Sequence, residues 1–455
     1  MKTEAASVAP IRSFYERHKL WVWAGIWLLT RAVMVVQVGF WNHATGLQLE
    51  DTGLVYQGWS DELSRGLLPG GETWQYPPGA ALVLLLPRLG LGLTEFGQSF
   101  VASMLLFDLI GFGLIATLSR REGRDTGVWA WLLAMPMLRT LPLLRFDLSA
   151  TVLAVGGMIV VHRRPAWLGA LAGLGATIKA WPIVLLFGEW DWRGLLRSAL
   201  AAAAAIALVF AISAVAFDGN QLGFLSEQGG RGLQIESVAS LPWHLRQLVT
   251  GEAPNAVVRY GALEIASHPA DVAAKLLDWA TLAVLVAAGV WWLLRTRAIG
   301  RGRNDLASVA LSRDFVFTVV LALMVTSRVL SSQYLVWSLG LAAVLLSTRG
   351  SRLSRPALIT VGAAVITAAA YGPLGAEGPF PIWGSPFNMV VRNLALLVAV
   401  VDAALTMGLA LRAQPDPGPA PEETDLAPPL SGSRPAGAPA AGPAADGGGP
   451  RPERR

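Results

Sequence analysis

Long apolar stretches recur along the chain, separated by short polar segments. They run for roughly 15–22 residues and do not alternate apolar with polar positions. A helix needs about 20 apolar residues to cross a bilayer, whereas the strands of a membrane barrel are about 10 residues long and alternate. The pattern therefore predicts membrane helices near 20–40, 98–118, 127–141, 146–161, 166–190, 195–216, 276–294, 315–330, 334–348, 356–371 and 389–411.

The apolar stretch at 78–93 differs from the others. Proline stands at its start, and Pro87 and Arg88 lie inside it, so it would span a membrane poorly. We expect it to lie at the outer interface as a juxtamembrane or re-entrant helix. The stretch at 166–190 is long enough for a hairpin of two short helices that turns near 179–182. Counted in this way, the chain has about twelve membrane segments, with both termini inside.

The distribution of basic residues supports this topology. Of the 36 lysines and arginines, 24 fall in the segments that it places inside, and every short inner loop is basic. If 78–93 crossed the membrane, every later loop would lie on the opposite side. The basic loops would then lie outside, against the rule that basic loops of membrane proteins lie inside. The sequence thus predicts an all-α polytopic membrane protein. Its expected parts are a cytoplasmic N-terminus at 1–19, a membrane domain at 20–411 with large outer loops at 41–97 and 217–275, and a disordered cytoplasmic tail at 412–455.

Composition narrows the class of protein further. Hydrophobic residues make up 53% of the chain and charged residues only 15%, whereas soluble domains carry about 25% charged residues. The net charge of +5 resides in the inner loops, so it indicates topology and not nucleic-acid binding. The chain has no cysteine, and its five histidines show neither HxxxH nor HExxH spacing. We therefore expect no metal ion.

Several charged residues lie near the outer ends of the predicted helices. A charge at mid-membrane costs roughly 2.5–3.5 kcal/mol on insertion scales, so we expect each such residue to have a structural or functional role. Arg145 and Asp147 mark one turn, Lys179 marks the tip of the hairpin, and Arg328 follows another helix. Together with Asp51 of the first outer loop, they indicate a site for an anionic lipid headgroup.

Plainer interpretations exist for some of these residues. Asp51 is a good N-cap for a helix that begins at residue 52. Arg145 and Asp147 could simply pair at a helix end. Lys179 is harder to explain structurally, because its neighbours in the sequence are apolar and no acid is adjacent.

In the first outer loop, Asp61 and Glu62 with Arg65 are typical of a solvated helix face that carries an i,i+4 pair.

Two polar features of the outer loops have open interpretations. The stretch 228–237 is rich in glycine and carries Arg231 and Glu236, so it could cradle a phosphate or a sugar, or be a flexible connection. The tryptophans and tyrosines of the first outer loop could form an interfacial belt or stack on sugar rings.

Five stretches resemble, in chain order, the actinobacterial branch of glycosyltransferase family 87, polytopic enzymes of the C superfamily. They are 51–59 with 74–79, 145–147, 173–182, 231–237 and 326–337. One departure is Ser332, where relatives often carry proline before the Gln-Tyr pair.

The resemblance implies a GT-C-type fold with a long first outer loop that carries juxtamembrane helices at 52–65 and 78–93. It also implies an inverting glycosyltransferase of the plasma membrane. The enzyme would move a hexose, with mannose as the expected sugar, from a polyprenyl-phosphate carrier to a glycolipid or glycan hydroxyl at the outer face. No cofactor, metal or nucleic acid is implied. Asp51 would be the catalytic base, and the expected substrate-binding residues are Lys179, Arg328, Arg145, Asp147, Arg231, Glu236, Gln333, Tyr334, Tyr56 and Tyr76.

A transporter or a flippase for lipid-linked sugars is the alternative. The long acidic first loop and the lack of an internal repeat weigh against it. The two classes differ in where the charged residues meet, because an enzyme gathers them at one outer cavity and a transporter lines a path through the membrane with them.

Overall fold

The computed structural model describes residues 2–44, 54–72, 74–90, 95–370 and 386–413. Residues Met1–Ala413 form one compact unit, which holds all the described elements. Two predictions lie outside the described residues: the role of Asp51, and the disordered tail over 414–455.

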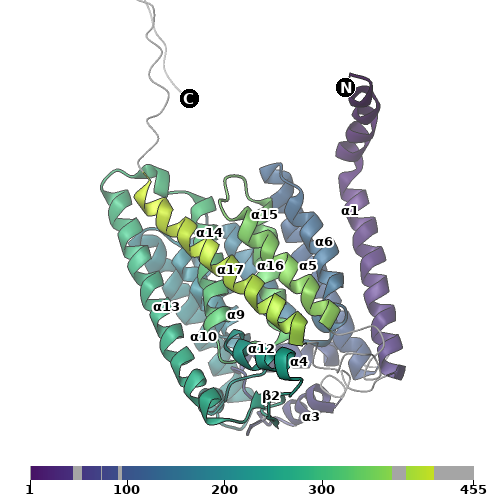
Figure 1. Cartoon of the computed structure of the whole chain (residues 1–455), viewed down its shortest axis with the longest axis vertical. Helices are drawn as coiled ribbons and strands as arrows, with labels where there is room; N and C mark the ends of the chain where they lie inside the picture. The colour runs from purple at the N-terminus through teal and green to yellow at the C-terminus, as the bar shows by residue number, and fades with distance from the viewer. Residues whose placement is uncertain (1, 45–53, 73, 91–94, 371–385, 414–455) are drawn as a thin grey trace, which may run out of the picture. The chain divides into compact units, whose positions relative to one another are not determined.

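The unit is helical, as the apolar stretches predicted (Figure 1). Six helices contain apolar windows long enough to cross a membrane. They are α1 (Lys2–Ala44), α5 (Phe96–Glu122), α10 (Trp192–Ala216), α13 (His268–Gly300), α14 (Val309–Thr326) and α17 (Pro386–Arg412).

Shorter apolar helices complete the bundle: α4 (Gly79–Leu89), α6 (Thr126–Met137), α8 (Asp147–Val160), α9 (Pro165–Ile178), α15 (Leu335–Ser347) and α16 (Ser354–Ala370). The all-α, multi-pass fold class is confirmed, while the count of twelve membrane segments stays a prediction. The other elements are α3 (Gln57–Ser64), α7 (Leu141–Leu144), α11 (Gly223–Gly229), α12 (Leu241–Thr250), the 3₁₀ turns η2 (Trp181–Gly188), η3 (Val238–Ser240), η4 (Asn304–Leu306) and η5 (Ser332–Tyr334), and the strands β1 (Ala256–Arg259) and β2 (Ala262–Ile265).

Burial separates inner from outer helices. Every residue of α15 is buried, and α15 is apolar around its whole circumference, as a central helix must be. Helices α10 and α13 instead leave leucine and valine side chains such as Leu200 and Val286 exposed. Exposed apolar surface of this extent is what a lipid-facing helix presents. The bundle thus has a packed centre around α14 and α15 and an apolar outer surface.

The predicted hairpin at 166–190 is present. Helix α9 ends at Ile178, the chain turns at Lys179 and Ala180, and η2 returns as a 3₁₀ helix. Two glycines four residues apart let α9 approach α10, because a Cβ at Gly169 or Gly173 would collide with the α10 backbone. The close packing of α9 on α10 fixes the position of Lys179 at the tip.

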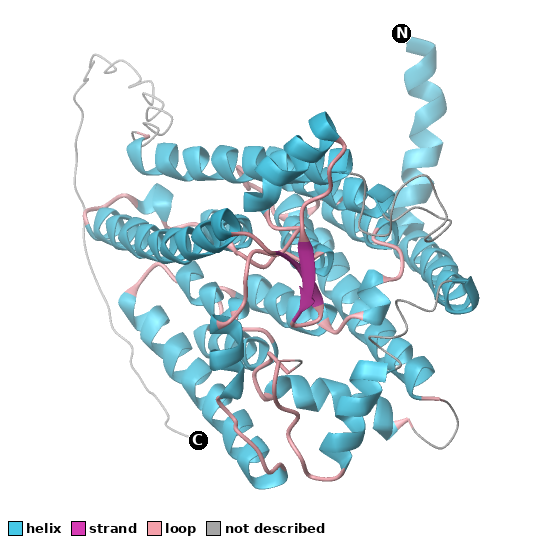
Figure 2. Cartoon of the chain, turned by 60° about the horizontal axis from the view of Figure 1, so that its bottom comes forward, coloured by secondary structure: helices cyan, strands magenta, loops and turns pink. Residues whose placement is uncertain are grey.

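A two-stranded hairpin, β1–β2, was not predicted from the sequence. It lies among the loops at the end of the bundle that Figure 2 brings forward. Its turn contains Tyr260 and Gly261, both with positive φ, the geometry of a type I′ turn that matches the twist of the strands. The glycine-rich stretch runs along β2, where the Ile235 amide donates to Leu263 O (2.9 Å) and the Ile265 amide donates to Leu233 O (2.9 Å). This pairing ties the stretch to the β-hairpin.

A buried ion pair attaches α1 to the bundle. Arg31 of α1 and Asp108 of α5 are both 2% exposed. The Arg31 Nε and Nη2 atoms donate to the two oxygens of Asp108 at 2.7 and 2.9 Å. The indole groups of Trp27 and Trp131 donate to the same carboxylate. All four contacts satisfy a charge that would otherwise be costly inside a membrane.

We expect Arg31→Met to destabilise the protein strongly, because it leaves the Asp108 carboxylate buried and unpaired. Removing one partner of a buried pair costs about 3–5 kcal/mol. The midpoint of thermal unfolding in detergent should fall accordingly. Arg246→Met is the control, since Arg246 and Glu252 form an exposed pair, and exposed pairs contribute about 0–1 kcal/mol. Equal midpoints for the two variants would contradict the assignment.

Candidate active site

Lys179 lies at the centre of the candidate site. Its side chain is 8% exposed, and its Nζ atom is 3.2 Å from Asp147 Oδ1. The same carboxylate oxygen accepts a hydrogen bond from Trp337 Nε1 at 2.9 Å. Asp147 is the first residue of α8, where the helix dipole favours a negative charge. The acid that the sequence around Lys179 lacks thus comes from a different helix.

Four aromatic rings surround the Lys179 ammonium group. Its Nζ atom is 4.6 Å from the ring centre of Tyr76, 4.9 Å from Phe146, 5.6 Å from Tyr334 and 5.9 Å from Trp337. Cation–π attraction at these distances stabilises the charge in a partly desolvated place. The predicted residues Asp147, Tyr76 and Tyr334 thus meet at Lys179.

Aromatic residues of the first outer loop pack beside this centre. The ring centres of Trp59 and Trp74 are 5.3 Å apart, and Trp59 lies 5.5 Å from Tyr56. Burial raises the pKa of the Tyr56 phenol, so Tyr56 is neutral at physiological pH and accepts a hydrogen bond from Arg145 Nη1 at 3.4 Å. These rings form a packed wall that brings the loop and Arg145 to the site.

The glycine-rich stretch contributes Arg231. Its Nη1 atom donates to Gln75 Oε1 at 2.8 Å, and its Nε atom is 3.5 Å from Glu264 Oε1. Gln75 adjoins Tyr76, which lies over Lys179. Arg231 is therefore a second buried cation whose contacts connect the first outer loop to the β-hairpin.

Arg328 also contacts the glycine-rich stretch. Its Nη2 atom donates to Gln228 O at 3.0 Å, and its Nε atom is 3.5 Å from Asp278 Oδ1. These contacts give Arg328 a structural role, and its role in substrate binding stays a prediction.

Glu236, near the end of the glycine-rich stretch, contacts Ser332. Ser332 Oγ donates to Glu236 Oε2 at 2.6 Å, and Arg392 Nη1 lies 3.4 Å from that oxygen. Ser332 thus makes a side-chain hydrogen bond that a proline at this position could not make. The neighbouring Gln333 is half-buried in η5, between Ser332 and Tyr334.

Two sequence interpretations need correction. Asp147 pairs with Lys179 rather than with Arg145. The Asp61 carboxylate pairs with Arg88 of α4, and Arg65 contacts only the Asp61 backbone oxygen in the contacts described (3.2 Å). Asp61 therefore joins the helices α3 and α4, both of which form within the predicted ranges; its carboxylate stays partly exposed but pairs with Arg88 and not with Arg65.

Several contributors to the site were not predicted from the sequence. Gln75, Phe146, Glu264 and Trp337 all contact predicted residues. Phe146 and Trp337 lay inside the motifs and could have been found there. Glu264 belongs to the unpredicted β-hairpin and gave no signal.

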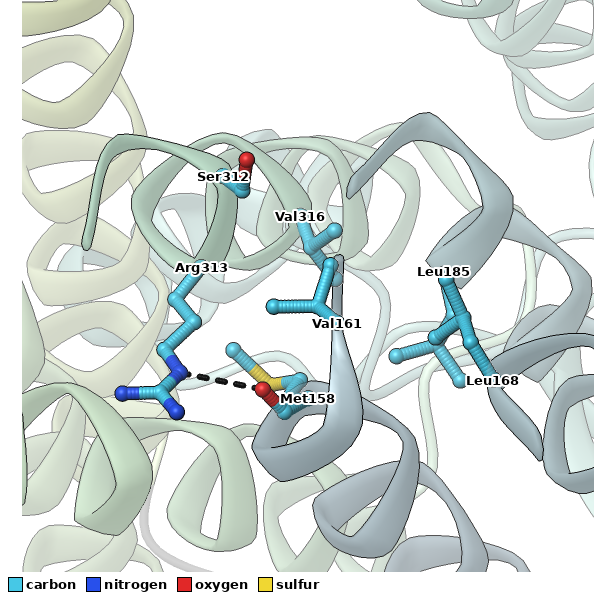
Figure 3. Close-up of a pocket in the computed structure, with 7 residues that line it drawn as sticks. All are labelled: Met158, Val161, Leu168, Leu185, Ser312, Arg313 and Val316. Atoms are coloured by element: carbon cyan, nitrogen blue, oxygen red, sulfur yellow. Dashed lines mark hydrogen bonds between the residues drawn. The ribbon is translucent and has the colours of Figure 1, made fainter. Parts of the chain in front are cut away.

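A small pocket lies elsewhere in the bundle (Figure 3). It is lined by seven residues and is too tight to hold a water molecule, so it is not a substrate site. Its polar lining comes from Ser312 and Arg313, whose Nε atom donates to Met158 O at 3.0 Å.

Comparison with known proteins gives one family match. The model of glycosyltransferase family 87 matches residues 74–327. Among solved structures, the chain is similar to ArnT from Cupriavidus metallidurans bound to undecaprenyl phosphate, with 13% identity and a TM-score of 0.41 over 85% of this chain and 77% of that one. Both values are low, so no residue role is transferred from that protein. No curated protein matches the chain.

Proposed function

Because this chain belongs to glycosyltransferase family 87, we propose that it transfers a hexose, most simply mannose, from a polyprenyl-phosphate carrier to a hydroxyl of a glycolipid or cell-envelope glycan. The proposal includes a GT-C-type fold and a plasma-membrane location with the site at the outer face. The donor has an apolar tail, a phosphodiester and a sugar ring. An enzyme for it needs lipid access, a cation and a surface for the ring.

One observation carries the proposal. Lys179 is a buried cation enclosed by aromatic rings, and its location is fixed by Asp147. A lysine held in this way can pair with a phosphate, and aromatic faces pack against the apolar face of a sugar. Because these groups meet at the tip of the α9–η2 hairpin, they support an enzyme site rather than a transport path through the bundle.

The reaction would proceed by single displacement with inversion. Asp51 would take the proton from the acceptor hydroxyl as the oxygen attacks the anomeric carbon, and the bond from that carbon to the phosphate oxygen would break. The departing phosphate gains one negative charge. Lys179, with Arg145 and Arg231 nearby, would stabilise that charge. A phosphate monoester is a weak base, so the step needs no metal and no cofactor.

The decisive experiment supplies the donor directly. Membranes that contain the protein should transfer label from polyprenyl-phosphate-[¹⁴C]mannose to an endogenous glycolipid or glycan. Membranes without the protein should not. Transfer from other polyprenyl-phosphate hexoses but not from mannose would change the sugar and keep the enzyme class. Absence of transfer from every polyprenyl-phosphate sugar would contradict the proposal.

The proposed topology makes a labelling prediction. The chain has no native cysteine, so single cysteines report their own side of the membrane. Cysteine at the exposed positions Glu72 and Glu252 should react with a membrane-impermeant thiol reagent in intact cells. Cysteine at the exposed Asn304 should react only after the cells are opened. Reaction of the Asn304→Cys variant in intact cells would invert the topology.

A further inference from the structure

Three potential metal ligands meet at the end of the hairpin opposite Lys179. His162 follows α8, Glu189 follows η2, and Asp191 precedes α10. One ligand atom of each residue lies within 4.8 Å of those of the other two. Helix α9 has 14 residues and rises about 1.5 Å per residue, so this cluster is about 20 Å from Lys179 along the hairpin. The proposed transfer reaction makes no use of it.

In each of the three residues, one polar atom contacts a group of the protein, and a second polar atom remains available to a ligand at the centre of the cluster. Asp191 Oδ1 accepts a hydrogen bond from the Gly194 amide at 2.8 Å and caps α10. Glu189 Oε1 accepts one from the His162 amide at 3.2 Å. His162 Nε2 is 2.9 Å from Ser312 Oγ. The remaining atoms are Asp191 Oδ2, Glu189 Oε2 and His162 Nδ1.

Glu189 is the observation that points to a ligand. Its side chain is fully buried, and its Oε2 atom accepts no hydrogen bond of normal geometry from any described residue. Yet His162 Nδ1 lies 2.8 Å from that oxygen. A carboxylate oxygen and an imidazole nitrogen at this distance need a proton or a metal ion between them. A neutral imidazole can carry that proton on Nδ1 and donate it to the carboxylate, or one metal ion can bind both atoms.

Asp191 distinguishes the two possibilities. A Cβ atom placed on Gly194 would lie 2.6 Å from Glu189 Oε2 and 3.1 Å from Asp191 Oδ2. Both carboxylates therefore reach over the same glycine, which leaves room for them because it has no side chain. A proton joins only two of the three groups, whereas a metal ion joins all three. The second carboxylate thus favours a metal ion.

We propose that His162, Glu189 and Asp191 bind one divalent transition-metal ion of the Zn²⁺ type. One imidazole and two carboxylates form a ligand set that suits zinc or manganese. Ser312 supports the imidazole through its other nitrogen, as outer partners do in metal sites. The ion would fasten the ends of α8, η2 and α10 together at the base of the hairpin that carries Lys179. The spacing of these three residues in the sequence matches no common metal-binding motif, so the site was not predicted from the sequence.

The test uses the whole protein, purified in detergent through a tag without histidine and stripped with a chelator. Titration with Zn²⁺ in a calorimeter should show one saturable site per chain. Zn²⁺ should also raise the midpoint of thermal unfolding, because an ion that binds only the folded state stabilises it. Few other ligands compete, since the chain has no cysteine and only five histidines.

Matched variants locate the site. Asp191→Asn keeps the helix cap but removes a ligand charge, so Zn²⁺ affinity should fall at least about tenfold. Glu189→Gln should behave in the same way. Asp305→Asn is the control, because Asp305 lies outside the cluster, where its Oδ2 atom is 2.8 Å from Arg303 Nη2. Absence of saturable Zn²⁺ binding by the unaltered protein would overturn the proposal in favour of a hydrogen bond from His162 Nδ1 to Glu189. Wild-type affinity in Asp191→Asn would overturn it too, and neither result depends on whether Glu189→Gln folds.

Discussion

Asp51→Asn will abolish most sugar transfer, with turnover falling by at least about 10²-fold. Asparagine has nearly the size of aspartate but cannot accept the acceptor's proton, and general-base assistance contributes about 10²–10⁴-fold. Asparagine also caps a helix about as well as aspartate does. If Asp51 is only a cap, the variant will fold and keep its activity. Rates of label transfer at saturating donor distinguish these outcomes.

Asp61→Asn is the matched control for Asp51→Asn. The Asp61 carboxylate pairs with Arg88, and both side chains are partly exposed. Asparagine can still accept a hydrogen bond from that guanidinium group, so transfer should change little. If Asp61→Asn is inactive and Asp51→Asn is active, the base is Asp61 and the enzyme class stands. If both variants are active, the acid–base mechanism fails.

The membrane fold could be predicted well because its cause is local. A stretch of apolar residues is driven into a bilayer by its own composition, and the helix satisfies its own backbone. The hairpin at 166–190 was predicted for the same reason. The β1–β2 hairpin was not, because its strands are four residues long and half exposed, so neither length nor periodicity distinguishes them from a loop.

The site was predicted less completely, because its contacts join distant segments. The sequence indicated that Lys179 is a candidate phosphate ligand, but not that Asp147 from the start of α8 pairs with it. Arg231 pairs with Glu264, which lies 33 residues away, and Glu236 pairs with Arg392, which lies 156 residues away. A charged residue in an apolar stretch therefore reports that a partner exists, while only the packing of the helices identifies it.

A single substitution of Lys179 changes two properties at once, because Lys179 is both the expected phosphate ligand and the partner of Asp147. Lys179→Met removes the expected phosphate ligand and should reduce transfer severely. It also leaves the Asp147 carboxylate buried and unpaired, which costs about 3–5 kcal/mol of stability. A loss of activity in this variant alone would therefore not separate a binding role from unfolding.

The double variant Lys179→Met with Asp147→Asn separates the two effects. It removes both charges, and the asparagine Oδ1 can still accept the hydrogen bond from Trp337 Nε1. We expect its midpoint of thermal unfolding to return towards that of the unaltered protein, while transfer stays lost. Lys179→Arg keeps the positive charge and should retain part of the donor binding, because a phosphate needs charge more than one particular geometry. Normal donor KM and kcat in the stable double variant would remove Lys179 from the site. The phosphate would then have to be held by other cations, such as Arg145, which donates to Tyr56, and Arg231, which donates to Gln75 beside Tyr76.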